Sequence, residues 1–461
     1  MTNLIFWNTI SLYGNNVNIH INSEWRTQMK DQIIERKEYL ERLIAKRENG
    51  LVKIITGVRR CGKSFLLFTL YKQYLINSGV QEDQIISLAL DNVLNFQYRD
   101  PLMLSDYLNE KTAAVGKTYY ILLDEIQFVG KKKVSDNPEI FVTFYDVLNS
   151  LLQKGNTDIY VTGSNSKMLS SDIATEFRGR GDELHIAPLS YSELYRSRGG
   201  DKADLFVEYL TYGGMPMVYS KKSDAEKKKY LADLFIETYM KDITERHSIA
   251  YPEALGMIAN ELSSSVGSLT NSSKISNTLK TVKGVALDSE TVGAYLCHLT
   301  DAYLFSKADR YDVKGKRYFS FPSKYYCVDP GLRNAQLNFR QMEETHLMEN
   351  VIYNELKVRG YSVDVGVVES IETINGKRQR VTREIDFVLN AETPGERYYI
   401  QSALNTDDPE KMKQEIRPFL KLKNDFTKRI VLTKTSMKPW TDEYGIVHIG
   451  IYDFLLGDRF E

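Results

Sequence analysis

The feature that most constrains this sequence is the stretch Gly57–Ser64, which reads GVRRCGKS and fits the pattern G-x-x-x-x-G-K-[ST] at every fixed position. The apolar, β-branched residues 51–56 before it are typical of a buried strand, and residues 65–71 after it are typical of a helix packed on a sheet. A strand, a glycine-rich turn and a helix in this order predict a loop whose backbone N–H groups surround phosphate. The positive end of the helix dipole adds to this attraction.

The loop predicts a site for ATP and Mg²⁺ in which single side chains have separate tasks. Lys63 is expected to reach the β- and γ-phosphates and to act in catalysis, and Ser64 is expected to hold Mg²⁺. Cys61 lies near the start of the helix, so it is either a redox-sensitive thiol or a small residue that fills the loop. The residues expected to contact the nucleotide are Gly57, Val58, Arg59, Arg60, Cys61, Gly62, Lys63, Ser64 and Phe65.

A second apolar run, Thr118–Leu123, ends in two carboxylates, Asp124 and Glu125. After a phosphate loop, the first acid at such a strand end is expected to help hold Mg²⁺ and its water. The second is placed to act as the general base that activates the attacking water. The alternative is a solvated acidic strand end. We expect Asp124 to be a metal ligand and Glu125 to be catalytic.

The strand expected at Asp158–Thr162 ends in small polar residues rather than acids. Ser164 or Asn165 is therefore expected to hydrogen-bond the γ-phosphate or the attacking water, and we name Asn165 as catalytic. The alternative for both is a turn or a helix cap.

Arg178 and Arg180 precede a further strand, Glu183–Ala187, and are candidates for an arginine finger. Such an arginine is supplied by a neighbouring subunit or by a moving domain. If a neighbouring subunit supplies it, the protein works as a homo-oligomer, and activity per subunit rises with concentration. The alternative is an arginine paired with a local carboxylate.

Composition sets broader limits on the fold and its setting. The chain has 461 residues, enough for several domains, and its strands alternate with helices, which predicts an α/β fold with a mostly parallel sheet. The three cysteines are far apart in the sequence and imply no disulfide framework, which fits the cytoplasm. No apolar run is long enough to span a bilayer. A net charge of −1 requires any nucleic-acid binding to come from a local basic patch.

Further motifs accompany the loop in a fixed order. They are Leu123-Asp124-Glu125-Ile126-Gln127, Thr162-Gly163-Ser164-Asn165, Phe177-Arg178-Gly179-Arg180, Pro188-Leu189-Ser190-Tyr191, Tyr212-Gly213-Gly214-Met215-Pro216, Lys324–Arg333 and Arg383–Phe387. With them, almost everything after residue 25 resembles the prokaryotic P-loop ATPases of the AAA type that carry a C-terminal domain of unknown function. The resemblance implies ATP binding, an AAA+ parallel-sheet core, a winged-helix module and a restriction-endonuclease-like α/β domain.

We therefore expect five parts along the chain. They are an N-terminal arm at 1–24, an ATPase core at 25–189, a helical lid at 190–249, a winged-helix-like module at 250–324 and a nuclease-like domain at 325–461. In the fourth part, two helices and a basic hairpin predict either DNA binding or packing between domains. The basic residues of the hairpin are Lys307, Arg310, Lys314, Lys316 and Arg317.

The nuclease-like domain is expected to be inactive. A working site of this fold has an acid on one strand, an acid, a spacer and a lysine on the next, and often a glutamate on a helix. Asp386 and Glu349 match two of these positions, but the second strand reads Gln401-Ser402-Ala403 and offers neither a carboxylate nor an amine.

Together these features predict an ATPase that hydrolyses ATP with Mg²⁺ and couples hydrolysis to a conformational change of its C-terminal half, with DNA as a candidate partner. Two alternatives remain open from the sequence. One is a nucleotide-gated switch that turns over slowly, and the other is an ATP-dependent nuclease.

Overall fold

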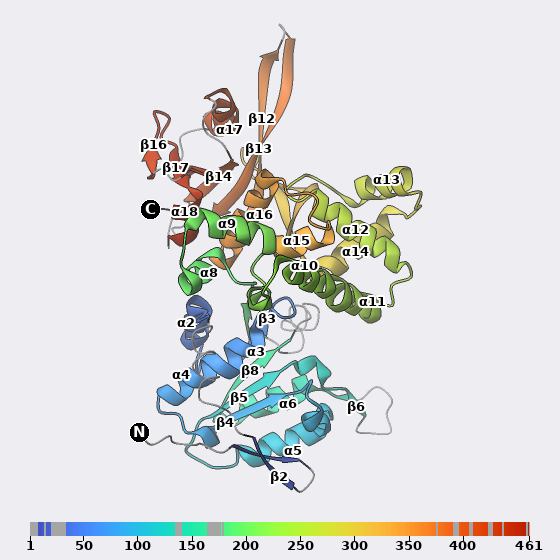
Figure 1. Cartoon of the computed structure of the whole chain (residues 1–461), viewed down its shortest axis with the longest axis vertical. Coiled ribbons are helices and arrows are strands. Elements are labelled where there is room, and N and C mark those ends of the chain that lie inside the picture. The colour runs from blue at the N-terminus through green and yellow to red at the C-terminus, as the bar shows by residue number, and fades with distance from the viewer. Residues whose placement is uncertain are drawn as a thin grey trace.

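The computed structural model describes residues 8–12, 15–19, 34–133, 141–163, 177, 179–374, 377–390, 396–404, 409–422, 427–435, 438–457 and 460. Of the predicted site residues, Ser164, Asn165 and Arg178 lie outside this set. In the expected N-terminal arm, β1 (Asn8–Leu12) and β2 (Asn15–Ile19) pair antiparallel. The rest divides into a lower sheet, an upper sheet and helices between them (Figure 1).

The lower sheet is the core of the predicted ATPase. Its strands, in spatial order, are β4 (Ile85–Ala89), β5 (Tyr119–Asp124), β8 (Thr157–Thr162), β3 (Val52–Thr56) and β9 (Gly181–His185). All four strand pairs are parallel, which confirms the predicted parallel sheet. Strand β8 lies between β3 and β5, so the strand before the phosphate loop and the strand that ends at Asp124 are not neighbours. The carboxyl ends of all three meet at one edge.

Helices cover both faces of this sheet, which explains why β3 and β5 are buried along their whole length. The run after the phosphate loop is continuous and consists of α3 (Lys63–Phe65), η1 (Leu66–Tyr71) and α4 (Lys72–Asn77). The other elements are η2 (Glu82–Gln84), η3 (Val93–Arg99), α5 (Pro101–Lys111), η4 (Ile126–Phe128), β6 (Lys132–Lys133), β7 (Phe141–Val142) and α6 (Phe144–Gln153).

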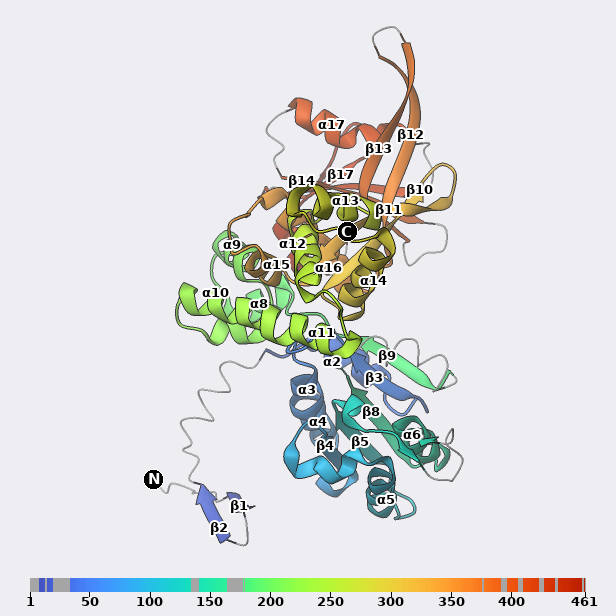
Figure 2. The same cartoon turned by 90° about the vertical axis from the view of Figure 1, so that its right-hand side faces the viewer.

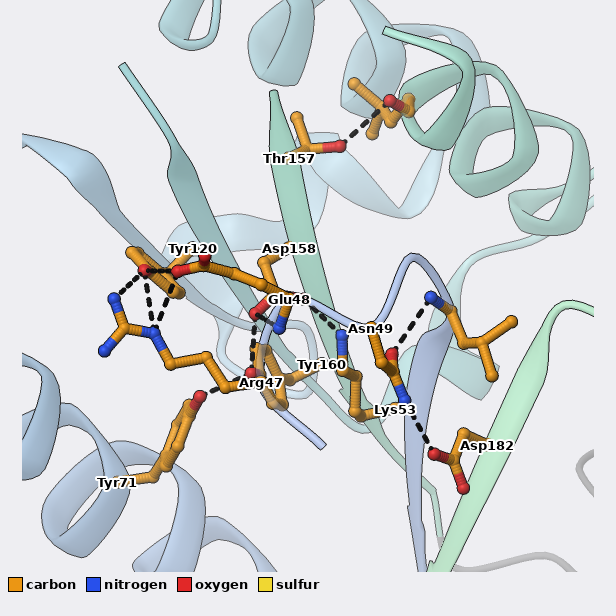
Figure 3. Close-up of polar contacts among 12 residues, drawn as sticks. Arg47, Glu48, Asn49, Lys53, Tyr71, Tyr120, Thr157, Asp158, Tyr160 and Asp182 are labelled. Carbon is orange, nitrogen blue, oxygen red and sulfur yellow. Dashed lines mark hydrogen bonds and ion pairs between the residues drawn. The ribbon is translucent and has the colours of Figure 1, made fainter. Parts of the chain in front are cut away.

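The opposite edge of the sheet, where its strands begin, is held by a polar network (Figure 3). Part of this network comes from the segment that follows helix α2 (Lys37–Ala45). Lys53 is fully buried and forms an ion pair with Asp158 on the neighbouring strand. The backbone N–H of Glu48 donates to the same carboxylate at 3.0 Å, and Asn49 donates to Asp182 at 2.9 Å. These bonds fix the segment after α2 to β8 and β9, at the edge of the sheet opposite the phosphate loop.

A helical segment, residues 191–247, follows the core, as expected for the proposed lid. It contains α8 (Tyr191–Arg198), α9 (Lys202–Tyr212), η6 (Pro216–Ser220), α10 (Asp224–Asp233), η7 (Leu234–Met240) and α11 (Lys241–His247). Next come α12 (Pro252–Ser264), α13 (Ser272–Lys283) and α14 (Ser289–Asp301). An isolated antiparallel bridge joins Thr270, between the first two of these helices, to Ser323.

The upper sheet has eight strands in the order β11 (Arg317–Cys327), β10 (Phe305–Asp312), β12 (Val363–Ile374), β13 (Lys377–Asn390), β14 (Arg397–Ala403), β15 (Thr427–Thr433), β17 (Val447–Gly450) and β16 (Trp440–Thr441). Its helices are α15 (Pro330–Gln336), α16 (Glu344–Val358), α17 (Pro409–Leu420) and α18 (Ile451–Leu456). The antiparallel pairing of β13 with β14 confirms the hairpin expected there.

The basic hairpin β10–β11 belongs to this upper sheet, because β10 also pairs with β12 in parallel. The domain boundary predicted between residues 324 and 325 falls inside β11 and is therefore wrong. The sequence pattern suggested a free wing, because a hairpin joins residues that are close in the chain and leaves a local signal. The pairing of β10 with β12, about fifty residues later in the chain, leaves no such signal.

Two of the motifs, Tyr212–Pro216 and Lys324–Arg333, meet between the helical segment and the upper sheet. The N–H of Gly214 donates to Asp329 Oδ2 at 2.5 Å, and a Cβ on Gly213 would lie 2.0 Å from Asp329 Oδ1. Asn334 Nδ2 donates to the carbonyl oxygen of Leu210 at 2.8 Å. Burial raises the pKa of Asp329 to about 6, although backbone N–H groups oppose the rise. This joint, formed by residues 210–214 and 329–334, ties α9 directly to α15.

Candidate nucleotide site

The phosphate loop has a backbone that requires glycine at both fixed positions. Gly57 has a φ of 136° and Gly62 a φ of 106°, values that L side chains rarely adopt. A Cβ on Gly57 would also lie 2.1 Å from the carbonyl oxygen of Ile186. Lys63 is buried, and its Nζ donates to the carbonyl oxygens of Gly57 and Val58 at 2.9 and 3.0 Å. Both acceptors are neutral, so these bonds leave the charge of the ammonium uncompensated over the loop.

The two predicted metal ligands lie together at the carboxyl edge of the sheet. Asp124 is the last residue of β5, and Ser64 lies in the first turn after the loop. Burial raises the pKa of Asp124, while hydrogen bonds from Thr162 and Ser64 oppose the rise. A hydroxyl and a carboxylate in contact are hard oxygen donors of the kind that Mg²⁺ prefers. These residues fit the metal that the motif implies.

Thr162 is a site residue that the sequence did not reveal. Its hydroxyl donates to Asp124 Oδ1 and accepts a hydrogen bond from the N–H of Glu125 at 3.0 Å. The sequence directed attention to Ser164 and Asn165, which follow the same strand but lie outside the described residues. The missing signal was the order of the strands. Only with β8 beside β5, in the register Leu123↔Val161, does Thr162 lie opposite Asp124.

Glu125 has an unusual backbone conformation. Its φ of 55° and ψ of 52° are left-handed, which costs a non-glycine residue of order 1–3 kcal/mol. Its side chain is half-buried, and Gln127 Nε2 donates to Glu125 Oε2. The turn therefore directs Glu125 away from the line of the strand, and Gln127 helps to orient the carboxylate. This is the geometry of a positioned side chain rather than of a freely solvated strand end.

Arg180 lies at the other end of the sheet. Its carbonyl oxygen accepts a hydrogen bond from the N–H of Val52 at 2.8 Å, at the start of β3, whereas the phosphate loop follows the end of that strand. Five residues of strand span roughly 17 Å. Arg180 is exposed there and is remote from the phosphate loop of its own chain. Its part as a finger in a second subunit remains a prediction, and Arg178 lies outside the described residues.

Neighbouring elements brace the loop through its backbone. Arg36 is buried and donates to the carbonyl oxygen of Cys61 at 2.8 Å, and it also pairs with Glu193 at 2.9 Å. From the helical segment, the hydroxyl of Tyr239 donates to the carbonyl oxygen of Arg59 at 2.8 Å. Neither residue carries a local sequence signal, because each reaches the loop from a distant part of the chain.

Cys61 is fully buried, and its Sγ lies 3.5 Å from the carbonyl oxygen of Ile186. A reactive thiol needs access to solvent. The structure therefore favours the second of the two roles considered for Cys61, that of a small residue filling the loop.

Comparisons with known proteins agree with this geometry. A family model of the AAA domain matches residues 49–195, and a model of a domain of unknown function (DUF8612) matches residues 203–343. An uncharacterised protein of Haemophilus influenzae is 34% identical over 437 residues, which cover 93% of this chain and 100% of that protein. The chain belongs to the AAA-type P-loop ATPases.

More distant relatives of this ATPase are also found. An uncharacterised protein of Methanocaldococcus jannaschii is 28% identical over 357 residues, 74% of this chain and 72% of that protein. Among solved structures, the ORC2 protein of Aeropyrum pernix is 13% identical, with a TM-score of 0.32, and the alignment covers 71% of this chain and 94% of that one. Because that score is low, the structural likeness carries no argument about function.

The C-terminal half of the ATPase holds a buried ionic cluster. Lys324 Nζ, on β11, lies 2.9 Å from Glu349 Oε1, 2.6 Å from Glu384 Oε1 and 3.4 Å from Asp386 Oδ1. Tyr326 donates to Glu349 at 2.8 Å. The three carboxylates raise the pKa of Lys324, although burial opposes the rise. Burial raises the pKa of Glu349, although Lys324 opposes the rise.

This cluster changes the account of the nuclease-like site. The sequence indicated that an amine was missing, since β14 carries Gln401 and Ala403 at the expected positions. The structure supplies one from β11, and it lies among the carboxylates where a cation would be held. Among the described residues, no group of three or more His, Cys, Asp or Glu side chains is arranged to hold a metal ion.

The predicted basic residues of the hairpin do not form one surface. Lys307 pairs with Asp309 at 2.7 Å, and the guanidinium of Arg310 lies over the ring of Phe319, 5.2 Å from its centre. Lys314 and Lys316 are exposed on the turn between β10 and β11, and Arg317 is exposed as the first residue of β11. Among the described helices, none has the length and apolar character needed to cross a membrane.

Proposed function

We propose that this protein binds ATP with Mg²⁺ at Gly57–Phe65 and hydrolyses it. The observation that carries the proposal is the contact of Ser64 and Thr162 with Asp124, next to Glu125 and close to Lys63. Five side chains with the required chemistry thus come from three strand ends. The direct test is steady-state ATP turnover, measured with and without Mg²⁺ and with the mass of the particle determined in parallel.

In the proposed reaction each side chain has one task. Lys63 turns from its carbonyl acceptors to the β- and γ-phosphate oxygens and stabilises the charge that develops there. Glu125, oriented by Gln127, accepts a proton from the water that attacks the γ-phosphate. Ser64 and Asp124 would hold Mg²⁺, which supplies charge neutralisation to the phosphate oxygens when bound.

We further propose that the helical segment senses the state of the loop and passes it on. Arg59 of the loop pairs with Asp242 of α11 at 2.8 Å, in addition to its backbone bond from Tyr239. At its other end the segment is tied to α15 through Gly214 and Asp329. A movement of the loop on hydrolysis would be transmitted along these contacts to the C-terminal half. Slow turnover by the intact protein, unchanged by any nucleic acid, would favour the nucleotide-gated switch instead.

Replacing Lys63 with Ala is expected to weaken ATP binding by about 10–100-fold, the effect of losing a hydrogen bond from a charged donor. Equilibrium titration with a fluorescent ATP analogue measures the change. Lys72→Ala, at the start of α4 in the same helical run, is the matched control and should bind ATP as the parent does. An unchanged affinity in Lys63→Ala would place the phosphates elsewhere.

Activity per subunit is expected to rise with protein concentration if Arg180 acts on the site of a second copy. The expectation follows from its distance from the phosphate loop of its own chain. In Arg180→Ala the rise should disappear, while the affinity for ATP stays unchanged. Constant activity per subunit down to a strict monomer would show that no second copy takes part.

The remaining assignments extend this proposal. Helices α12–α14 and the bridge at Thr270 support a winged-helix module, and the position of Lys324 supports an inactive nuclease-like domain. The three free cysteines fit a cytoplasmic protein. Incubation with supercoiled, linear and single-stranded DNA and with RNA, in Mg²⁺ and in Mn²⁺, tests the nuclease assignment. Cleavage that is lost in Asp386→Ala would reverse it and favour an ATP-dependent nuclease.

A further inference from the structure

A two-stranded ribbon projects from the upper sheet. It consists of Val368–Ile374 of β12 and Lys377–Arg383 of β13, and is called here the ribbon. Seven residue pairs join its strands, from Val368↔Arg383 to Ile374↔Lys377. Strand β12 pairs with β10 only at residues 365–367, and β13 pairs with β14 only at 387–390. Within the described residues, the two strands of the ribbon therefore pair only with each other, over roughly 20 Å. Both views show it extending beyond the body of the molecule (Figures 1 and 2).

The side chains of the ribbon divide between its two faces, because directly paired residues point to the same side. One face carries Arg378 and Arg380 of β13 and Ile371 of β12. All three side chains are exposed, Ile371 to 75%. The opposite face carries Arg383 and Glu372, which form two parallel hydrogen bonds of 2.7 and 2.9 Å. The first face is therefore available for contact, while on the second face Arg383 and Glu372 join the two strands of the ribbon.

The ribbon is fixed to its surroundings at two points. Lys314 Nζ, on the turn between β10 and β11, donates to the carbonyl oxygen of Glu369 at 2.9 Å. Lys421, just after α17, lies 3.6 Å from Glu372. The direction in which the ribbon projects is thus set by contacts with two other segments. A pre-oriented surface loses little conformational freedom when it binds a partner.

Positive charge is concentrated on the ribbon and on this turn. The six exposed basic residues are Lys314, Lys316, Arg317, Lys377, Arg378 and Arg380. Within the part of the chain that the structure describes, two carboxylates pair with them: Arg380 pairs with Glu369, and Arg317 lies 3.3 Å from Asp312. Since the whole chain has a net charge of −1, this is a local basic patch in an almost neutral protein.

We propose that the ribbon and the turn at its base form a binding surface for double-stranded DNA. The major groove of B-form DNA, about 12 Å wide, admits a two-stranded β-ribbon, whereas the narrow major groove of duplex RNA does not. Guanidinium groups suit phosphate oxygens because of their planar, forked donors. The surface is distinct from helices α12–α14 and from the nucleotide site, and binding at it does not depend on ATP hydrolysis.

A simpler reading is that the charges protect the ribbon from aggregation. Both of its edges are unpaired in the described structure, and charged residues on such edges prevent association with other strands. This reading predicts that neutral variants aggregate but that the parent protein has no special affinity for DNA.

The test is the binding of the full chain, without nucleotide, to a fluorescently labelled 30-base-pair duplex over a series of salt concentrations. Each phosphate contact contributes about 0.9 to the slope of log K against log salt. Arg378→Ala/Arg380→Ala is expected to reduce that slope by about 2 and to weaken binding at least 10-fold at low salt. Arg378→Lys/Arg380→Lys keeps both charges and should retain the slope. The double variant Lys229→Ala/Lys413→Ala removes two exposed lysines elsewhere and should behave as the parent.

Several results would overturn the proposal. These are no binding of duplex DNA by the parent, an unchanged slope in Arg378→Ala/Arg380→Ala, tighter binding of duplex RNA or of polyglutamate than of DNA, or binding that depends on Lys307 and Arg310 instead of the ribbon. ATP turnover of the variants is measured alongside. Because their nucleotide site is intact, loss of DNA binding with unchanged turnover separates this proposal from the ATPase proposal. Thermal unfolding and light scattering identify a variant that loses DNA binding because it misfolds or aggregates. In that case Arg378→Lys/Arg380→Lys, which keeps both charges, decides whether the ribbon binds DNA.

Discussion

Replacing Glu125 with Gln is expected to leave ATP binding intact and to slow ATP turnover by roughly 10²–10⁴-fold, the usual effect of removing a positioned general base. The amide has nearly the same shape as the carboxylate but cannot accept the proton. The N–H of residue 125 should still donate to Thr162, so the sheet edge keeps its geometry. Turnover under saturating ATP and Mg²⁺, with ATP affinity measured separately, gives the two quantities needed.

Glu110→Gln is the matched control for this variant. Glu110 is exposed on α5 and far along the chain from the strand end, so the same loss of one carboxylate should not affect turnover. Thr162→Val provides a second comparison, since it removes the hydroxyl that contacts Asp124 and the N–H of Glu125 but keeps the carboxylate of Glu125. If Glu125→Gln turned over ATP at the rate of the parent, another group would have to be the base.

The second large effect is expected at Lys324. Replacing it with Met keeps the length of the side chain but removes the ammonium, which leaves Glu349, Glu384 and Asp386 facing one another. Breaking a buried charge pair by removing one partner costs about 3–5 kcal/mol. Lys324 is 2% exposed, so little solvent is present to screen the carboxylates. The free energy of unfolding of the C-terminal half, followed by urea denaturation, is expected to fall by that amount.

The loss should depend on pH in a predictable direction. Burial raises the pKa of Glu349 and of Glu384, and the ammonium of Lys324 opposes both rises. Without Lys324 the folded state therefore binds protons more tightly than the unfolded state. The stability of Lys324→Met then falls as pH increases through the range in which these carboxyl groups lose their protons. The destabilisation relative to the parent should therefore be smaller at pH 5 than at pH 8.

A compensating change provides the control. In Lys324→Met/Glu349→Gln one of the three mutually repelling carboxylates is also removed, so part of the lost stability should return. The single variant Glu349→Gln, which leaves Lys324 with two carboxylates, completes the cycle. Equal destabilisation by Lys324→Met at both pH values, without recovery in the double variant, would mean that Lys324 contributes through packing and not through its charge.

The sequence by itself determined the parts of this protein whose signals are local. The phosphate loop was predicted residue by residue, because a strand, a turn with glycine at two positions of positive φ and a helix occupy consecutive positions. Asp124 and Glu125 were predicted because a buried strand rarely ends in two acids unless they serve a function. The parallel α/β core followed from the alternation of strands and helices.

Tertiary structure decided the contacts made by residues that are far apart in the chain. Thr162 became a neighbour of Asp124 because β8 pairs with β5, and strand order cannot be read from the composition of either strand. Lys324 lies 25 residues from Glu349 and 62 from Asp386, and it joins them because β11, α16 and β13 converge. The hairpin β10–β11 was assigned to the wrong domain for the same reason. Local pattern specifies which element forms, whereas pairing between distant elements specifies which side chains meet.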